Sequence, residues 1–99
     1  MLTTCPDETF AKQLARQIVE AKLAACVNII PNLTSIYSWK DEIQCGTEVQ
    51  LFLKTKTEVF TELNEFINQH HPYEVVEIIA LDIQQGDNNY LSWINETLK

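Results

Sequence analysis

The stretch VVEIIALDI, residues 75 to 83, constrains the fold most because it is apolar on both sides. Side chains along a β-strand point alternately to the two faces of a sheet. One face would carry Val76, Ile78 and Ala80, and the opposite face Ile79, Leu81 and Ile83. A strand that is apolar on both faces needs cover on both, so we predict a sheet that is packed on each side.

The rest of the sequence predicts three more strands and three helices. A helix is indicated where apolar residues recur with a period of 3.6, and a strand where β-branched and aromatic residues predominate. A capping box of Thr55 and Glu58 is expected to open the second helix. We expect strands at 1–5, 26–40 (ended or bulged at Pro31–Asn32), 47–55 and 75–83, a turn at Asp41–Glu42, and helices at 6–24, 58–70 and 90–98.

This order, β-α-β-β-α-β followed by a C-terminal helix, is that of the ferredoxin-like split βαβ plan. We therefore predict an α+β fold in a single domain, residues 1–99, whose antiparallel sheet carries two helices on one face. The other face of such a sheet is polar in a monomer, yet here it carries Phe52 and half of the apolar residues of the 75–83 strand. Another copy of the chain is the simplest cover, which predicts an obligate homo-oligomer whose copy number the pattern leaves open.

Composition excludes several classes of partner. The net charge of −7 argues against nucleic acid, because phosphate backbones repel an acidic chain. The sequence contains no run of about 18 apolar residues, so we predict no membrane span, and no secretory signal is visible. The odd number of cysteines (Cys5, Cys26 and Cys45) and the lack of a CxxC motif indicate reduced thiols and a cytoplasmic location.

Two adjacent histidines, His70 and His71, are the obvious metal candidates because imidazole binds copper, zinc and nickel. Neighbouring residues of an extended segment point to opposite sides, so the two rings do not readily chelate one ion within one chain. The structural alternative is that His71 and Pro72 only close the preceding helix.

A catalytic role has less support. Cys5 stands just before a helix N-terminus, a setting that favours a thiolate, but a buried inert thiol is the commoner state. No base is identifiable beside Cys5, and no glycine-rich phosphate loop is present. We therefore do not expect an enzyme or an organic cofactor.

Six short strings resemble the CutA family of divalent-cation tolerance proteins in order and spacing: TTCPDE, EAKLAACVNIIP, SIYSW, FLKT, HHPYEVVEIIALDI and YLSWI. The resemblance covers nearly the whole chain. It implies a ferredoxin-like subunit, a homotrimer with its sheets facing inward, and binding of copper or another divalent cation in metal tolerance. It also implies an architecture similar to that of the trimeric PII signalling proteins.

The resemblance implies His70, His71 and Glu77 as copper ligands. In this chain Thr3 stands where a relative has a strand cysteine that has been proposed to bind copper, so that sulfur ligand is missing. The alternative for Glu77 is an ion pair with Lys54 or Arg16 across a subunit interface.

A second group of residues predicts an inter-subunit pocket: Cys5, Tyr37, Trp39, Lys54, Tyr73 and Glu74. One interpretation is a PII-like cleft for a small anion, with Lys54 supplying the positive charge, in a scaffold or regulatory trimer. The other is a purely structural interface, since Trp and Tyr are enriched at interfaces in general.

Overall fold

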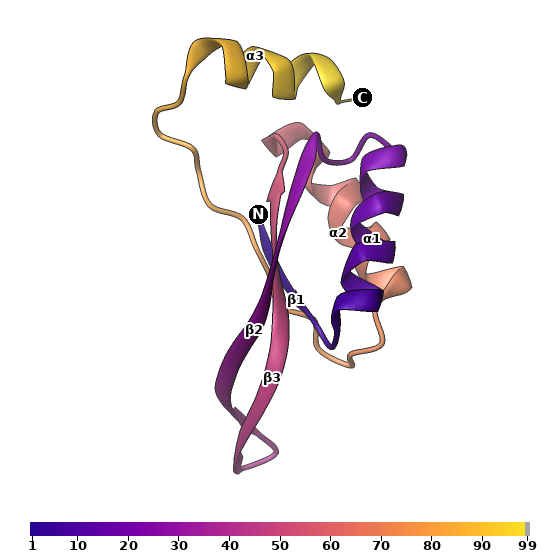
Figure 1. Ribbon diagram of the computed structural model, residues 1–99, viewed down its shortest axis with the longest axis vertical. Coiled ribbons are helices and arrows are strands. Elements are labelled where there is room, and N and C mark those ends of the chain that lie inside the picture. The colour runs from indigo at the N-terminus through magenta and orange to yellow at the C-terminus, as the bar shows by residue number, and fades with distance from the viewer. Residues whose placement is uncertain (99) are drawn as a thin grey trace.

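The computed structural model describes residues 1–98, and the domain predicted for 1–99 therefore extends one residue beyond the described part. A four-stranded antiparallel sheet has the order β2-β3-β1-β4, and α1 and α2 lie side by side on one of its faces (Figure 1). The predicted α+β class and element order are confirmed. The elements are β1 (Leu2–Cys5), α1 (Glu8–Glu20), β2 (Cys26–Trp39), β3 (Glu42–Lys54), the 3-10 helix η1 (Thr57–Val59), α2 (Phe60–His70), β4 (Ile78–Ile79) and α3 (Asn88–Thr97).

The core lies between the sheet and the two helices. Alternate residues of β3 (Val49, Leu51 and Leu53) point toward the helices and are buried, as the period of two predicts. They meet apolar residues spaced three or four apart on α1 and α2: Ala11, Leu14, Ile18, Leu63 and Ile67. None of the helices in residues 1–98 is long and apolar enough to cross a membrane.

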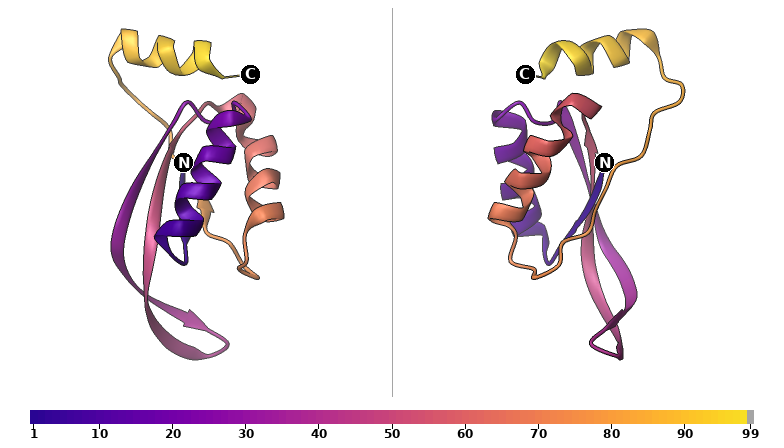
Figure 2. Two further views of the ribbon diagram at one scale, coloured as in Figure 1. Left: turned by 45° about the vertical axis from the view of Figure 1, so that its right-hand side comes forward. Right: turned by 180° about the vertical axis from the view of Figure 1, so that it is seen from behind.

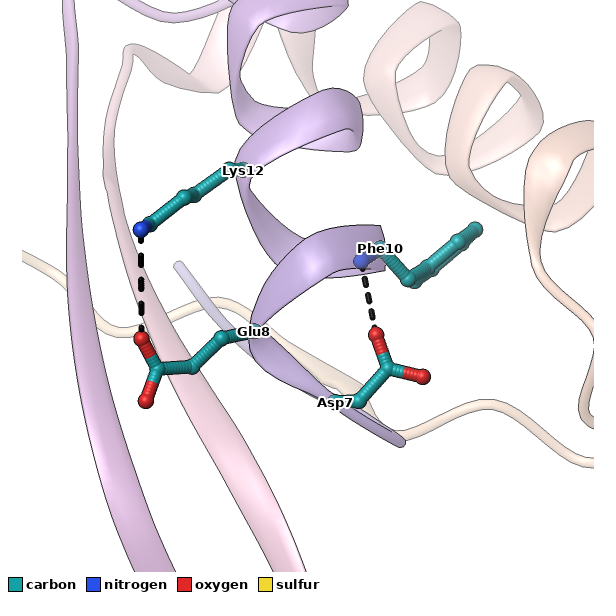
Figure 3. A network of polar contacts seen from close by, with 4 residues as sticks. All are labelled: Asp7, Glu8, Phe10 and Lys12. Carbon is teal, nitrogen blue, oxygen red and sulfur yellow. Dashed lines mark hydrogen bonds and ion pairs between the residues drawn. The ribbon is translucent and has the colours of Figure 1, made fainter.

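Helix α1 is defined at both ends by hydrogen bonds. The Asp7 carboxylate accepts from the backbone N–H of Phe10 at 2.8 Å, and Glu8 forms an ion pair with Lys12 one turn on, at 3.9 Å (Figure 3). At the other end Lys22 adopts a left-handed conformation with φ 60°, and the N–H groups of Lys22 and Leu23 donate to the carbonyls of Val19 and Ile18. This is a Schellman motif, which ends the helix four residues before the predicted Ala24.

Strands β2 and β3 form one long hairpin that projects beyond the helices (Figure 1). The predicted irregularity at Pro31–Asn32 is a shift of register between Ile30 and Leu33, where Asn32 has φ 62°. The predicted turn position was wrong by one residue. Lys40 and Asp41 both have positive φ and form a two-residue loop, while Glu42 already pairs with Trp39.

The predicted capping box at Thr55 and Glu58 is wrong. The Thr55 hydroxyl donates instead to the Leu23 carbonyl at 2.8 Å, a contact that joins the end of β3 to the end of α1. The helical segment begins with η1 and has no side-chain cap. Its predicted end is confirmed, since His71, the residue before Pro72, leaves the helix in an extended conformation.

The predicted strand at 75–83 is far shorter in the single chain. Only Ile78 and Ile79 pair with β1, opposite Thr3 and Leu2. The following residues leave the sheet edge and lead to α3, which lies apart from the other two helices (Figure 2). The Asp87 carboxylate caps α3 by accepting from Tyr90 N–H, and Ile94 and Leu98 join the core.

Apolar side chains remain exposed on the face of the sheet opposite the helices. Phe52 and Ile79 both pair with Leu2, so they share this face, and they are 38% and 47% exposed. Leu81 and Ile83, just beyond β4, are also exposed. This uncovered surface is what the two-sided apolar pattern predicts for one chain of an oligomer.

We expect Thr3→Val to stabilise the fold. The Thr3 side chain is fully buried and its Oγ1 has no hydrogen-bond partner among the described residues. Replacing an unpaired hydroxyl by a methyl group of similar size should raise the free energy of unfolding by about 1 kcal/mol. Urea titration at one fixed protein concentration measures this, with Thr4→Val as the control on the opposite face. A lower unfolding midpoint in Thr3→Val would contradict the unpaired hydroxyl.

Candidate functional site

A groove of about 770 Å³ lies between the projecting hairpin and the segment that precedes β4. Its charged lining residues are Glu48, Glu74 and Glu77, and no Lys, Arg or His lines it. Aromatic side chains from both walls also face it. The complete lining is Thr4, residues 34–39 of β2, Glu48 of β3 and residues 73–77.

Tyr73 ties the two walls of the groove together. Its hydroxyl donates to Glu48 Oε2 at 2.8 Å, which joins the 73–77 wall to β3. Burial, and then the hydrogen bond to the Glu48 carboxylate and its negative charge, raise the pKa of Tyr73 well above its ordinary value. Tyr73 is therefore a neutral donor throughout the physiological range.

His71 holds the corner from which this wall starts. Its Nε2 lies 2.8 Å from the Thr4 carbonyl and its Nδ1 lies 3.2 Å from the Tyr73 backbone N–H. A carbonyl only accepts and an N–H only donates, so Nε2 carries the proton and Nδ1 is the acceptor. Phe10 and Tyr73 contact the ring, and both ring nitrogens are engaged.

His70 differs from its neighbour. It is exposed, stacks on Phe66 with ring centroids 4.2 Å apart, and its Nδ1 lies 2.7 Å from the Phe66 carbonyl. Since that carbonyl accepts, Nδ1 carries the proton and the lone pair of Nε2 points elsewhere. An imidazole that donates one N–H to a backbone carbonyl has the arrangement usual for metal-binding histidines.

The predicted metal ligands are not brought together within one chain. Glu77 lines the groove, His71 is buried behind it, and His70 is exposed at the end of α2. Within residues 1–98 no group of three or more His, Cys, Asp or Glu is placed to hold a metal ion.

Four of the six predicted pocket residues do line the groove: Tyr37, Trp39, Tyr73 and Glu74. Lys54 does not, because it pairs with Cys26 at the opposite end of the hairpin and its ammonium donates to the Asn28 side chain. The predicted positive charge is therefore absent from the groove as one chain forms it. Cys5 is fully buried in the core.

The Cys5 thiol is not activated. Burial, followed by the negative charges of Asp7 and Glu48, raises its pKa to about 12. Cys5 is therefore a neutral thiol, in agreement with the inert state. Its position just before α1 does not make it a thiolate.

Sequence reasoning missed Glu48 and Thr4, which complete the groove. Glu48 pairs with Leu33 across the hairpin, just after the register shift, so its neighbours depend on where the bulge falls. Thr4 lies in the short strand β1 and lines the groove from there. The alternation of β3 could have predicted the side on which Glu48 lies, because Glu48 falls on the face opposite to that of buried Val49.

Residues 1–97 of the chain match the family model described as CutA1 divalent ion tolerance protein. The chain resembles a divalent cation tolerance protein from Thermus thermophilus, with a TM-score of 0.97 and 46% identity over 99% of this chain and 95% of that one. A CutA1 from Oryza sativa gives a TM-score of 0.96 and 38% identity over 99% and 90% of the two chains. The chain belongs to the CutA1 divalent ion tolerance family.

Curated relatives agree with this assignment. The CutA homolog of Xenopus laevis is 50% identical over 94% of this chain and 62% of its own length, and human CutA is 48% identical over 94% and 52%. The chain thus spans about half to three-fifths of these animal relatives. The divalent-cation tolerance protein CutA of Yersinia pestis is 44% identical over 99% of this chain and 82% of its own length.

We expect His71→Ala to destabilise the protein by about 2–3 kcal/mol, because it leaves the Thr4 carbonyl and Tyr73 N–H without partners and opens a cavity. His70→Ala removes an exposed ring and should change the free energy of unfolding by less than about 0.5 kcal/mol. Urea titrations of the two variants under identical conditions measure the difference. Equal effects would mean that the His71 hydrogen bonds do not hold the corner.

The three cysteines should react with a thiol reagent in the order of their exposure. Cys45 is exposed, Cys26 is intermediate, and Cys5 is buried with a raised pKa. Mass spectrometry after iodoacetamide treatment should find Cys45 modified first and Cys5 only after unfolding. Early modification of Cys5 would contradict this order.

The raised pKa of Cys5 also makes stability depend on pH. Because the folded Cys5 thiol holds its proton to a higher pH than the unfolded one, its contribution to stability is complete below pH 9 and is lost between pH 9 and about 12.

Proposed function

We propose that the protein is a homotrimeric, non-enzymatic divalent-cation-binding protein that acts in metal tolerance, with copper as the favoured ion. The observation that carries this proposal is the match of residues 1–97 to the divalent ion tolerance family. The acidic groove supports it, because three glutamates with no basic residue among them attract cations.

The proposed ligands are His70, His71 and Glu77, and the described contacts rank them. His70 offers a free Nε2 on an exposed ring whose Nδ1–H is already held by the Phe66 carbonyl. Glu77 offers an exposed carboxylate in the groove. His71 ranks last of the three, because it would have to give up its hydrogen bond to Thr4 or to Tyr73 in order to bind a metal.

Assembly is part of this proposal, because one chain supplies too few ligands. Structural and catalytic metal sites use three or four protein ligands. The exposed apolar residues on the open face of the sheet, including Phe52 and Ile79, support contact between copies. We also propose a reducing, cytoplasmic location, consistent with the free thiols of Cys5, Cys26 and Cys45.

A PII-like scaffold or regulatory trimer is the second candidate. It is favoured by the volume of the groove, about 770 Å³, which lies in the range of small-molecule sites. In this case the groove would close at a subunit boundary and transmit occupancy to a partner protein. If the ligand is a small anion bound by Lys54, that lysine has to come from a neighbouring copy.

Native mass spectrometry with one equivalent of Cu(II) per chain tests the metal proposal. We expect a trimer that takes up one ion per chain, with uptake lost in His70→Ala/Glu77→Gln because both proposed free ligands are removed. Glu65→Gln, which removes one exposed acid from α2, is the charge-matched control and should keep full uptake. Unchanged uptake in the double variant would reject this ligand set, and a metal-free trimer would leave the scaffold hypothesis as the better one.

A further inference from the structure

We propose that the groove between the hairpin and residues 73–77 binds an organic cation, an amine or quaternary ammonium group, by its aromatic and acidic side chains together. This site lies in the groove of the scaffold hypothesis and shares Glu77 with the proposed metal ligands, but binding of an organic cation there does not require a bound metal. The two ligand classes need different chemistry, since a divalent metal requires directed donor atoms and an organic cation requires π faces and diffuse negative charge.

The walls of the groove combine the two features that favour an organic cation. Tyr37 and Trp39 come from β2 and Tyr73 from the opposite wall, while every charged residue in the lining is a glutamate. Aromatic rings attract cations through the negative potential of their faces, and Trp does so most strongly. An anionic ligand would meet only repulsion, and a neutral apolar ligand would leave the carboxylates without compensation.

The Trp39 ring already has one cation near it, the ammonium of Lys40. This ammonium lies over that ring, 5.7 Å from the centroid. Lys40 belongs to the two-residue loop of the hairpin, is exposed, and makes no ion pair within residues 1–98. Lys40 does not line the groove, but the proposal predicts that its ammonium competes with a bound cation for the Trp39 ring.

The opposite wall is fixed before any ligand arrives. The Tyr73 hydroxyl is committed to Glu48, and the Tyr73 backbone N–H to His71. Glu48 accepts through Oε2, which leaves its other carboxylate oxygen available. A wall that is already ordered costs less entropy on binding than one that must be immobilised.

Tetramethylammonium is the probe, and tert-butanol, which has nearly the same shape without the charge, is its matched control. Saturation-transfer NMR on the probe methyl protons measures binding to the full chain. We expect saturable binding of tetramethylammonium and none of tert-butanol at the same concentration. Equal binding of both would show an apolar groove and overturn the proposal, as would no binding of either.

Variants then separate the two features. Trp39→Leu should weaken binding by about threefold, the contribution of one cation–π contact at an exposed site. Glu48→Gln/Glu74→Gln/Glu77→Gln should abolish binding, whereas Glu65→Gln should leave it unchanged. Lys40→Gln should strengthen binding by about threefold because it removes the competing cation, and Lys12→Gln, which changes the net charge equally but lies on α1, should not.

The outcome is independent of the metal test. His70→Ala should bind tetramethylammonium as the parent chain does, because His70 does not line the groove. Loss of tetramethylammonium binding in His70→Ala, or insensitivity to the triple glutamine variant, would overturn the organic-cation site. Glu77 belongs to both proposed sites, so His70→Ala, which changes only the proposed metal site, separates the two failures.

Discussion

The fold depends on the pairing of a strand only four residues long. β1 lies between β3 and β4, so the sheet is continuous only through Leu2–Cys5. Thr3 and Cys5 of this strand are buried on the helix side, and the carbonyl of Thr4 accepts the hydrogen bond from His71. That bond sets the corner after α2, and the corner sets both the 73–77 wall of the groove and the start of β4. The core and the groove are therefore positioned from the same strand.

Local periodicity predicted the elements whose packing is local. The buried residues of α1, α2 and β3 fall where periods of 3.6 and 2 place them, because each of these elements has one face on the core. Predictions failed where a long-range or unusual backbone contact decides the outcome. The hydroxyl of Thr55 bonds to Leu23 rather than to its own helix, and the Schellman motif at Lys22 has no glycine to reveal it.

The residues of the groove were also predicted only in part, because some of them meet through contacts that are distant in sequence. Tyr37, Trp39, Tyr73 and Glu74 were grouped from sequence because aromatic residues stood near a predicted boundary, and the structure brings these four to one groove. Lys54 lies away from the groove of its own chain, because the long hairpin places its two ends far apart. It pairs with Cys26, whereas Tyr37 pairs with Gln44 near the opposite end. Glu48 was missed because its relation to Tyr73 spans 25 residues.

The 75–83 segment connects the groove to the proposed assembly. Val75 lines the groove and is also 67% exposed, as is Ile36 of the opposite wall at 71%. It follows from the proposed trimer that copies covering these residues would exclude water from the groove. Attraction between its glutamates and a bound cation would then strengthen, while the same carboxylates without a cation would become costly to enclose. Cation binding and assembly would therefore favour each other by equal free energies, as linkage requires.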